Sequence, residues 1–547
     1  MKRPNQFTFA KFPSVGMQRS AFDMPFTYKT TLDAGYLVPC FQPIEILPGD
    51  TLNLRLSSFS RLATLIAPYM DNLFMDYFFF FVPNRLVWDD WEEFICADIN
   101  GPTGTIPQIK TGAAGSFAVG SLADYFGLPT GVNNLSVSAL PFRCYNLIFN
   151  EWFKREDLVT DSVINTGSTD EDWSDGDYVL RRRSKRPDYF VSSNLWPQKG
   201  PGVELPLGDS APVVGNGNAL GLTDGTNNYG LRSVYSNATG SVYGGSSAMV
   251  GKAVGTSSTS GDATANLATG VSNDPSKSGL IADLSQATAA TINSLRQAFQ
   301  IQRLFERDAL AGNGRYVEVL RSHFNVVSPD ARLQRPEYLG GGHIPINVHT
   351  VVQNSSTDST SPQGNLAGFG VGAAVDVGFT KSFVEHGYVI GLMCVRGEQT
   401  YQYGIDRQWS RKGRFDFYWP VLAHLGEQAV LNKEIYAQGE SVVDSDGNIV
   451  DDQPFGYQER WAELRYGASK ITGKLRSSAA GSLDVWHLAQ KWTSLPVLGE
   501  TFIGENPPID RVIAVQNEPQ FIYDSVIRAR FVRPLPMYSV PGLVDHF

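Results

Sequence analysis

Basic residues gather most densely in one short stretch of this 547-residue chain, and their natural chemistry is the binding of phosphate. Five of the six residues from 181 to 186 are basic: Arg181, Arg182, Arg183, Lys185 and Arg186. Arginine binds phosphate oxygens through a planar fork of donors, and lysine binds them through a compact point charge. The stretch predicts contact with a nucleic-acid backbone, and the alternatives are a solvated basic turn or a salt-bridge site between subunits.

A second stretch, 454–477, interleaves aromatic rings with long charged side chains. We expect its Pro-Phe-Gly-Tyr opening to form a turn and its rings to anchor it, which leaves the charges for a partner. Phosphate contact, with ion pairing between subunits as the alternative, is predicted for Arg460, Arg465, Lys470, Lys474, Arg476, Arg528 and Arg530. Subunit contact is predicted for aromatic residues of this stretch and of the N-terminal arm: Tyr457, Trp461, Tyr466, Phe7, Phe9 and Phe12.

Catalytic and metal-binding spacings are not found in the sequence. It has no Walker loop, no GxSxG, no HExxH and no GxGxxG after a strand. His343 and His349 would share one face of a strand, but two ligands without a third are a weak metal signal. The four cysteines form no CxxC pair, which favours buried free thiols. We therefore predict no enzyme activity, no metal and no cofactor.

The overall composition limits how such a chain can meet nucleic acid. Its net charge is −10, whereas proteins that bind nucleic acid through their bulk charge are usually basic. Any contact must use local patches or a basic helper protein. The densest apolar run, 77–82, is far shorter than the roughly 20 residues of a membrane helix. The N-terminus has no apolar run of a signal peptide, so we expect a protein that is not exported.

The elements that would carry these residues are mainly strands. In 51–57 the leucines alternate with Asn53 and Arg55, which indicates a strand with one buried face. The stretch 76–82 is apolar on both faces and predicts a strand buried on both. Further strands are expected at 316–326, 383–396, 415–419 and 521–533.

Helices are expected between the early and the late strands, at 85–95, 121–129, 141–157 and 283–311. Strands at both ends of the chain must then pair across this gap. The pattern predicts an antiparallel eight-stranded jelly-roll, a β-sandwich with long loop insertions that contain helices. Regular strand–helix alternation, which a parallel sheet would require, is absent.

Three divisions of the chain are expected. Residues 1–35 read as an extended arm, lying either on their own domain or on a neighbouring subunit. Residues 36–547 read as one jelly-roll domain with insertions. Within it, 211–270 holds twelve glycines and only four charged residues, which favours a flexible linker or a short-stranded surface projection.

Several longer motifs resemble the major capsid proteins of the Microviridae, small tailless single-stranded DNA phages, and within them the gokushovirus branch. The motifs run nearly from end to end and include PYMDNLFMDYFFFFVPNRLVWDDW (68–91), LPFRCYNLIFNEWF (140–153), SPDARLQRPEYLGGG (328–342), FDFYWP (415–420) and GEQAVLNKEIY (426–436). Together, and in this order, they are highly specific.

The resemblance implies a jelly-roll subunit that assembles with its copies into a T=1 icosahedral shell around circular single-stranded DNA. It also implies a small basic DNA-binding protein, an internal scaffolding protein and a minor pilot protein as partners. By the same resemblance, 211–270 would form a protrusion at the three-fold axis that contacts a host surface receptor. The protein would be part of the virion, assembled in the host bacterial cytoplasm. A carbohydrate-binding or carbohydrate-active jelly-roll protein is the alternative, since the chain is rich in tryptophan and tyrosine.

Overall fold

The computed structural model describes residues 19–96, 104–113, 115–203, 213–215, 221–223, 228–230, 280–282, 292–310, 315–359 and 362–538. The chain divides into two compact units, one of Met1–Lys199 with Phe305–Phe547, and the other of Gly200–Leu304. The predicted contact residues Phe7, Phe9 and Phe12 lie outside the described residues.

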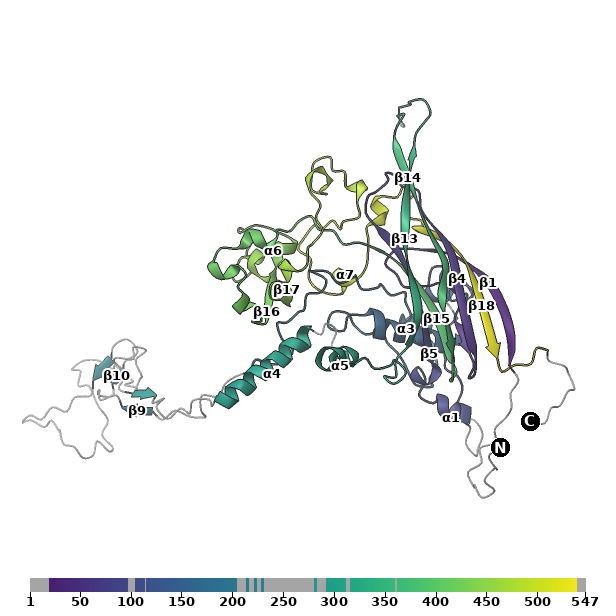
Figure 1. Ribbon diagram of the computed structural model, residues 1–547, viewed down its shortest axis with the longest axis horizontal. Helices are drawn as coiled ribbons and strands as arrows, with labels where there is room; N and C mark the ends of the chain where they lie inside the picture. The colour runs from purple at the N-terminus through teal and green to yellow at the C-terminus, as the bar shows by residue number, and fades with distance from the viewer. Residues whose placement is uncertain are drawn as a thin grey trace, which may run out of the picture. The chain divides into compact units, whose positions relative to one another are not determined.

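One antiparallel sheet dominates the first unit (Figure 1). Its strands follow the order β1–β18–β4–β14–β13–β5–β15–β2, and β3 also pairs with β15. Their bounds are β1 Ser20–Leu32, β2 Val38–Pro39, β3 Ile44–Ile46, β4 Thr51–Leu62, β5 Leu73–Pro83, β13 Glu337–Val352, β14 Leu366–Ser382, β15 Gly387–Gly397 and β18 Phe521–Arg533. Except at the β13–β14 hairpin, each neighbouring pair therefore joins an early strand to a late one, as the predicted jelly-roll requires.

The sheet folds into two facing layers because strands β13 and β14 separate beyond their turn and continue in different layers. Near its turn, 347–352 of β13 pair with 366–371 of β14. Beyond that point β13 pairs with β5, whereas β14 pairs with β4. One layer is then β1–β18–β4–β14 and the other is β13–β5–β15 with β2 and β3. This architecture confirms the predicted mainly β, jelly-roll class.

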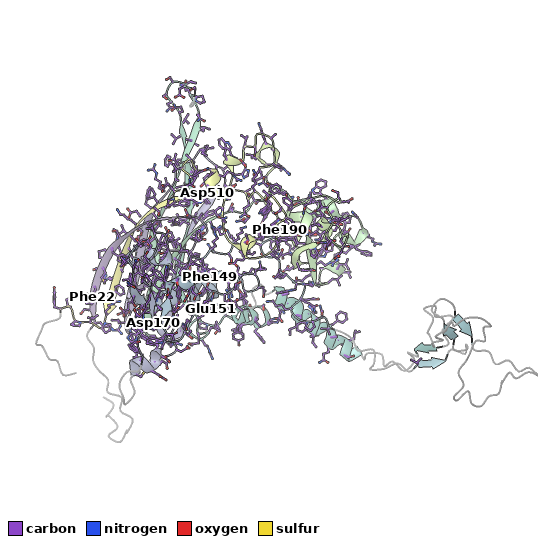
Figure 2. All side chains as sticks on the ribbon, turned by 180° about the vertical axis from the view of Figure 1, so that it is seen from behind. Phe22, Phe149, Glu151, Asp170, Phe190 and Asp510 are labelled. Atoms are coloured by element: carbon purple, nitrogen blue, oxygen red, sulfur yellow. The ribbon has the colours of Figure 1, made fainter. Side chains whose placement is uncertain are left out.

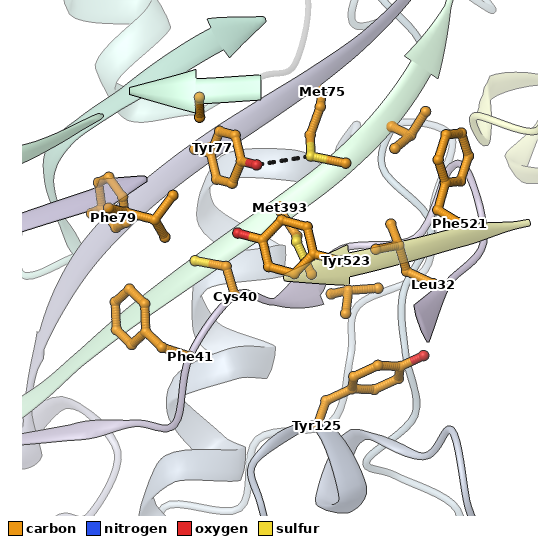
Figure 3. Close-up of a cluster of buried hydrophobic side chains, with 14 of the residues drawn as sticks. Leu32, Cys40, Phe41, Met75, Tyr77, Phe79, Tyr125, Met393, Phe521 and Tyr523 are labelled. Atoms are coloured by element: carbon orange, nitrogen blue, oxygen red, sulfur yellow. Dashed lines mark hydrogen bonds between the residues drawn. The ribbon is translucent and has the colours of Figure 1, made fainter. Parts of the chain in front are cut away.

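The core between the layers is built from the alternate residues of both (Figure 3). Tyr77 of β5 packs against Tyr523 of β18, with ring centroids 6.5 Å apart. Its hydroxyl also lies 2.6 Å from that of Ser58 on β4. The buried leucines of β4 complete this core from the opposite layer. The hydrophobic alternation of 51–57 therefore faces the core, as predicted.

A second core covers the other face of β5 and β15. Phe80 and Val82 point away from the sandwich and are buried against the helix-containing insertions. Figure 2 labels two rings of this core, Phe149 and Phe190. The prediction that 76–82 is buried on both faces is confirmed, because each face of β5 has its own core.

The insertions contain short helices and small sheets. The helices are α1 Trp91–Cys96, α2 Leu122–Tyr125, α3 Leu140–Ile148, α4 Ile292–Leu310, α5 Tyr316–Phe324, α6 Asn432–Ile435 and α7 Glu500–Ile503. The remaining strands of this unit are β6 Gln108–Lys110, β7 Ser136–Ser138, β8 Glu171–Asp172, β16 Glu427–Leu431 and β17 Pro454–Glu459. In the second unit, β9 Val213–Gly215 pairs with β12 Leu280–Ala282, and β10 Gly221–Thr223 pairs with β11 Asn228–Gly230. Of these, β9, β10 and β11 lie within 211–270.

Three local predictions are wrong. Within 316–326 the chain forms helix α5 (Tyr316–Phe324) and not a strand, and Asn325 caps that helix in the left-handed region at φ 55°. Residues 414–416 and 420–422 form 3-10 turns and no strand lies between them, so the aromatic alternation of 415–419 is not that of a strand. The predicted turn at Pro454 is instead the start of strand β17, which pairs with β16.

The predicted arm is in part a strand of the main sheet. From Ser20 to Leu32 the chain forms β1, paired with β18 in continuous register. This part of the arm therefore lies on its own domain, which is one of the two placements that the sequence allowed.

Candidate nucleic-acid interface

The layer β1–β18–β4–β14 has one face turned away from the core, and this open face carries charges. Along β4 and β18 every second residue is buried, and the residues between them are partly or fully exposed. The outward charged residues are basic by majority: Lys29, Arg55, Arg61, Arg528 and Arg530, against Asp23, Asp524 and Asp376 in the bulge of β14. In an acidic chain, this open face is a local basic patch.

Two arginines lie directly opposite each other at the centre of the open face. Arg528 of β18 pairs in register with Arg55 of β4. The next partners outward are Pro25 on β1 and Gly378 on β14, and neither carries a charge. Like charges that face each other across a ladder destabilise a sheet. An anion over this face would remove that cost.

Two further basic residues of the open face, Arg530 and Lys29, have weak partners. Arg530 Nε lies 3.6 Å from Asp23, and Lys29 Nζ lies 3.8 Å from Asp524. All four side chains are more than half exposed. Ion pairs of this kind contribute about 0–1 kcal/mol, so phosphate groups can replace them at little cost.

An exposed ring lies among these charges. Phe59 is 52% exposed on the outward side of β4, opposite Asp524. Ile522 and Val526, its diagonal neighbours on β18, are also exposed and apolar. Single-stranded nucleic acid binds where rings for base stacking lie beside basic side chains. The open face has both components.

The basic stretch 181–186 is placed differently, inside the chain. Arg182 donates to Glu505 O and Asn506 Oδ1 and lies 4.1 Å over the ring of Tyr36. Lys185 donates to Phe502 O at 2.6 Å, and burial lowers its pKa to about 8 against the opposing effect of nearby carboxylates. Arg181 donates to Asp177 O. Arg186 is the one exposed basic residue of the stretch, because the other four are half-buried or buried.

Arg183 belongs to a buried ionic cluster around Asp76 of β5. The Asp76 carboxylate accepts from Arg183, from Arg396 Nε at 2.9 Å and from His343 Nδ1 at 2.6 Å. Burial alone would raise the pKa of Asp76, but the hydrogen bonds from His343 and Arg183 and the nearby Arg396 hold it below its usual value. The cluster joins three strands to the 181–186 stretch, which is a structural role.

The charges of 454–477 are partly engaged within the chain. Arg465 pairs with Glu459 at 2.5 Å, and Lys470 pairs with Asp406 at 2.5 Å. Arg476 donates to Gln402 O, and Arg460 lies over the ring of Trp461. Lys474 is exposed. This stretch packs into the second core through Phe455 and Ala462, so it lies on the opposite side of the sandwich from Arg528 and Arg530.

The three aromatic residues predicted for subunit contact in this stretch differ in exposure. Trp461 is buried and its indole N–H donates to Leu422 O at 3.3 Å. Tyr457 is half-buried and exchanges backbone hydrogen bonds with Asn194. Tyr466 is 52% exposed. Of the three, Tyr466 offers the most surface to a partner.

Arg55, Arg61 and Phe59 were missed as candidate site residues. The alternation of 51–57 already places Arg55 on the outward side of its strand. Its position opposite Arg528 depends on the pairing of two strands that are far apart in sequence. No periodicity within either strand contains that information.

The histidines and the helices add two further observations. His349 stacks on Phe369, with centroids 5.2 Å apart, while His343 bonds to Asp76. Within the described ranges no group of three or more His, Cys, Asp or Glu is arranged to hold a metal ion. No helix in the same ranges is long and apolar enough to cross a membrane.

Comparison with known proteins gives matches along the whole chain. Residues 10–543 match the family described as capsid protein (F protein). The chain is 46% identical to capsid protein VP1 of Bdellovibrio phage phiMH2K, over 100% of this chain and 99% of that protein. It is 44% identical to capsid protein VP1 of Chlamydia phage 1 and 35% identical to that of Spiroplasma virus 4, in both cases over 98% of this chain and 97% of the relative.

These matches confirm the resemblance to Microviridae capsid proteins that the motifs indicated. They also account for the absence of catalytic spacing in the sequence, because the family is structural. The chain therefore belongs to the phage capsid protein (F protein) family and is a structural component of the virion capsid.

Proposed function

We propose that this capsid protein assembles with identical copies into a T=1 icosahedral shell, and that its open face lines the interior and contacts a circular single-stranded DNA genome. The observation that carries the DNA contact is the opposed pair Arg55 and Arg528 on a sheet face where, in the described part of the chain, both strands leave alternate side chains exposed. Insertions and a second core occupy the other side of the sandwich, which leaves that side for neighbouring subunits and the exterior.

The charge balance supports a shared task in packaging. The chain as a whole carries a net charge of −10, so its open face neutralises only the phosphates nearest to it. A small basic DNA-binding protein would neutralise the rest. An internal scaffolding protein and a minor pilot protein complete the partners of the proposed assembly. In the same assembly, 211–270 forms the protrusion that contacts a host receptor.

Substitution of both opposed arginines tests the DNA contact. In Arg55→Gln with Arg528→Gln, we expect shells to form, because removing like charges that face each other does not weaken the sheet. Affinity for a mixed-sequence single-stranded oligonucleotide should fall. The slope of log K against log salt should become shallower by about 0.7 for each phosphate that the variant no longer neutralises. Fluorescence anisotropy across a salt series measures both.

The matched control removes two exposed arginines from elsewhere, Arg321→Gln with Arg332→Gln. This control removes two positive charges, as the Arg55 and Arg528 variant does, and it should leave the slope of log K against log salt unchanged. Equal affinity and slope in the Arg55 and Arg528 variant would contradict the DNA contact. A wild-type chain that forms no closed particles in electron micrographs, with its packaging partners present, would contradict the shell.

A further inference from the structure

The loop that precedes strand β16 exposes an unusual number of large apolar side chains. This ring loop, defined as residues 409–425, includes Trp409, which is 76% exposed, and Val421, which is 90% exposed. Its other exposed apolar members are Phe415, Phe417, Tyr418, Trp419 and Leu425. Large exposed apolar side chains gathered in one short loop are typical of an interaction site.

The ring loop is held in shape by its own contacts. The Asp416 carboxylate accepts from the backbone N–H of Lys412 at 2.8 Å and of Gly413 at 2.7 Å. Trp419 Nε1 donates to Arg414 O at 3.1 Å. Arg411 pairs with Glu463 at 3.4 Å and so joins the loop to the 3-10 turn Ala462–Leu464 that follows β17. A preorganised loop loses little entropy when a partner binds, so its rings are suited to recognition.

The chemistry of the ring loop favours a protein partner over nucleic acid. Aliphatic Val421 and Leu425 add contact area but offer no face for base stacking. The guanidinium of Arg414 lies 4.9 Å over the ring of Trp419, so it already has a partner in the loop. Interface cores are enriched in aromatic residues and arginine, and these residues carry most of the binding energy.

A complementary surface exists elsewhere on the same chain. It is an acidic corner formed by two adjacent segments, in which Thr166 Oγ1 donates to Asp89 at 2.7 Å and Ser168 Oγ donates to Asp90. Figure 2 labels one of its members, Asp170. The exposed or half-exposed carboxylates of the acidic corner are Asp89, Asp90, Glu92, Glu93, Asp170, Asp172 and Asp175. The ring loop by contrast carries Arg411, Lys412 and Arg414 against Asp416 alone.

We propose that the ring loop of one copy docks on the acidic corner of a second copy. The inference rests on the proposed shell and identifies two surfaces that meet in it. Two different patches form such a contact, so it is heterologous, and heterologous contacts build closed assemblies when their rotation closes. The exposed Ile95 beside Glu92 and Glu93 gives the rings an apolar surface within the acidic corner.

Charge reversal on each side tests the docking. The loop variant is Lys412→Glu with Arg414→Glu, and the corner variant is Glu92→Lys with Glu93→Lys. Each alone should weaken self-association about 100-fold, because like charges then meet at the contact. The combination of all four substitutions should restore association. Sedimentation velocity over a concentration series and electron microscopy of particles measure the effect.

The control variant reverses two exposed arginines outside both surfaces, Arg321→Glu with Arg332→Glu, and should associate as the wild type does. Recovery in the combined variant also shows that the reversed loops remain folded. Wild-type shells together with an unaffected loop variant would overturn the docking and leave the shell intact. A combination that does not recover, or a loop variant that instead loses binding to DNA or glycans, would overturn it too.

Discussion

At the scale of single residues, the same side-chain type serves two purposes according to its surroundings. Arg396 and Arg183 pair with the buried Asp76 carboxylate and help to hold strands together. Arg55 and Arg528 face each other in solvent without such a partner. The first pair stabilises this chain, whereas the second is available to an external anion.

The Asp76 cluster leads to a stability prediction. Asp76→Asn removes the carboxylate that pairs with Arg396, whose side chain is 7% exposed, so the free energy of unfolding at pH 7 should fall by about 3–5 kcal/mol. Urea denaturation of the unassembled chain measures it. Asp524→Asn, which breaks an exposed pair with Lys29, is the matched control and should cost less than about 1 kcal/mol.

The same substitution has a defined pH dependence. The pKa of Asp76 is lower in the folded chain than in the unfolded chain, so its contribution is fully present above the unfolded pKa of about 4. As the pH falls through the folded pKa, this contribution is lost and the difference between wild type and Asp76→Asn should shrink. A difference that stays constant from neutral pH into acid would contradict the ionic origin of the effect.

At the scale of elements, strand β5 joins the two cores. Phe79 packs against Phe379 of β14, with centroids 5.6 Å apart. Phe80, on the opposite face, lies 5.5 Å from the ring of Trp152 and 5.8 Å from that of Phe153. One strand therefore fixes the sandwich to the helix-containing insertions.

Truncation of Phe80 should show how strongly the second core depends on β5. Phe80 is 1% exposed, so Phe80→Ala opens a cavity and should cost about 3–5 kcal/mol of unfolding free energy. Phe59→Ala, on the open face, is the matched control and should change stability by about 0.5 kcal/mol or less. Equal losses in the two variants would show that the second core adds no stability. Urea denaturation of both unassembled variants makes the comparison.

Sequence patterns identified most elements and failed where local signals conflict. The stretch 316–326 has β-branched Val317 and Val319 at alternate positions, yet the chain is helical there. In that helix Glu318 lies in the first turn and Arg321 and His323 in the last, which favours the helix dipole. His323 also pairs with Asp308 of α4 at 2.7 Å, a tertiary contact that no local pattern shows.

At the scale of the whole molecule, the chain separates into two units, and the sandwich lies entirely in one of them. Replacing 211–270, which lies wholly in the other unit, with a short Gly-Ser linker should leave the sandwich folded, since closing a shorter surface loop changes the entropy only slightly. Shells should still form, and adsorption to host cells should be lost. Micrographs and adsorption assays, compared with full-length particles, measure the two effects.

The two halves of this prediction fail in different ways. Loss of shells in the shortened chain would show that 211–270 is needed for assembly. Normal adsorption would show that attachment uses another surface. Either result leaves the proposed DNA contact of the open face to be tested separately, because Arg55 and Arg528 lie in the first unit.

The sequence by itself determined the strands with regular alternation, the double burial of β5 and the family. Each of these depends on the types and spacing of residues that are near one another along the chain. The β-rich pattern also suited a carbohydrate-binding protein, and full-length similarity to capsid proteins decided between the two.

Only the tertiary structure decided where the charges lie and which of them pair within the chain. Sequence drew attention to 181–186, yet Arg182, Arg183 and Lys185 are engaged inside the chain. The opposed pair of Arg55 and Arg528 arises where β4 meets β18, more than four hundred positions later in the chain. Whether a charge is neutralised or free depends on neighbours brought by long-range pairing and by burial, and neither is encoded in local spacing.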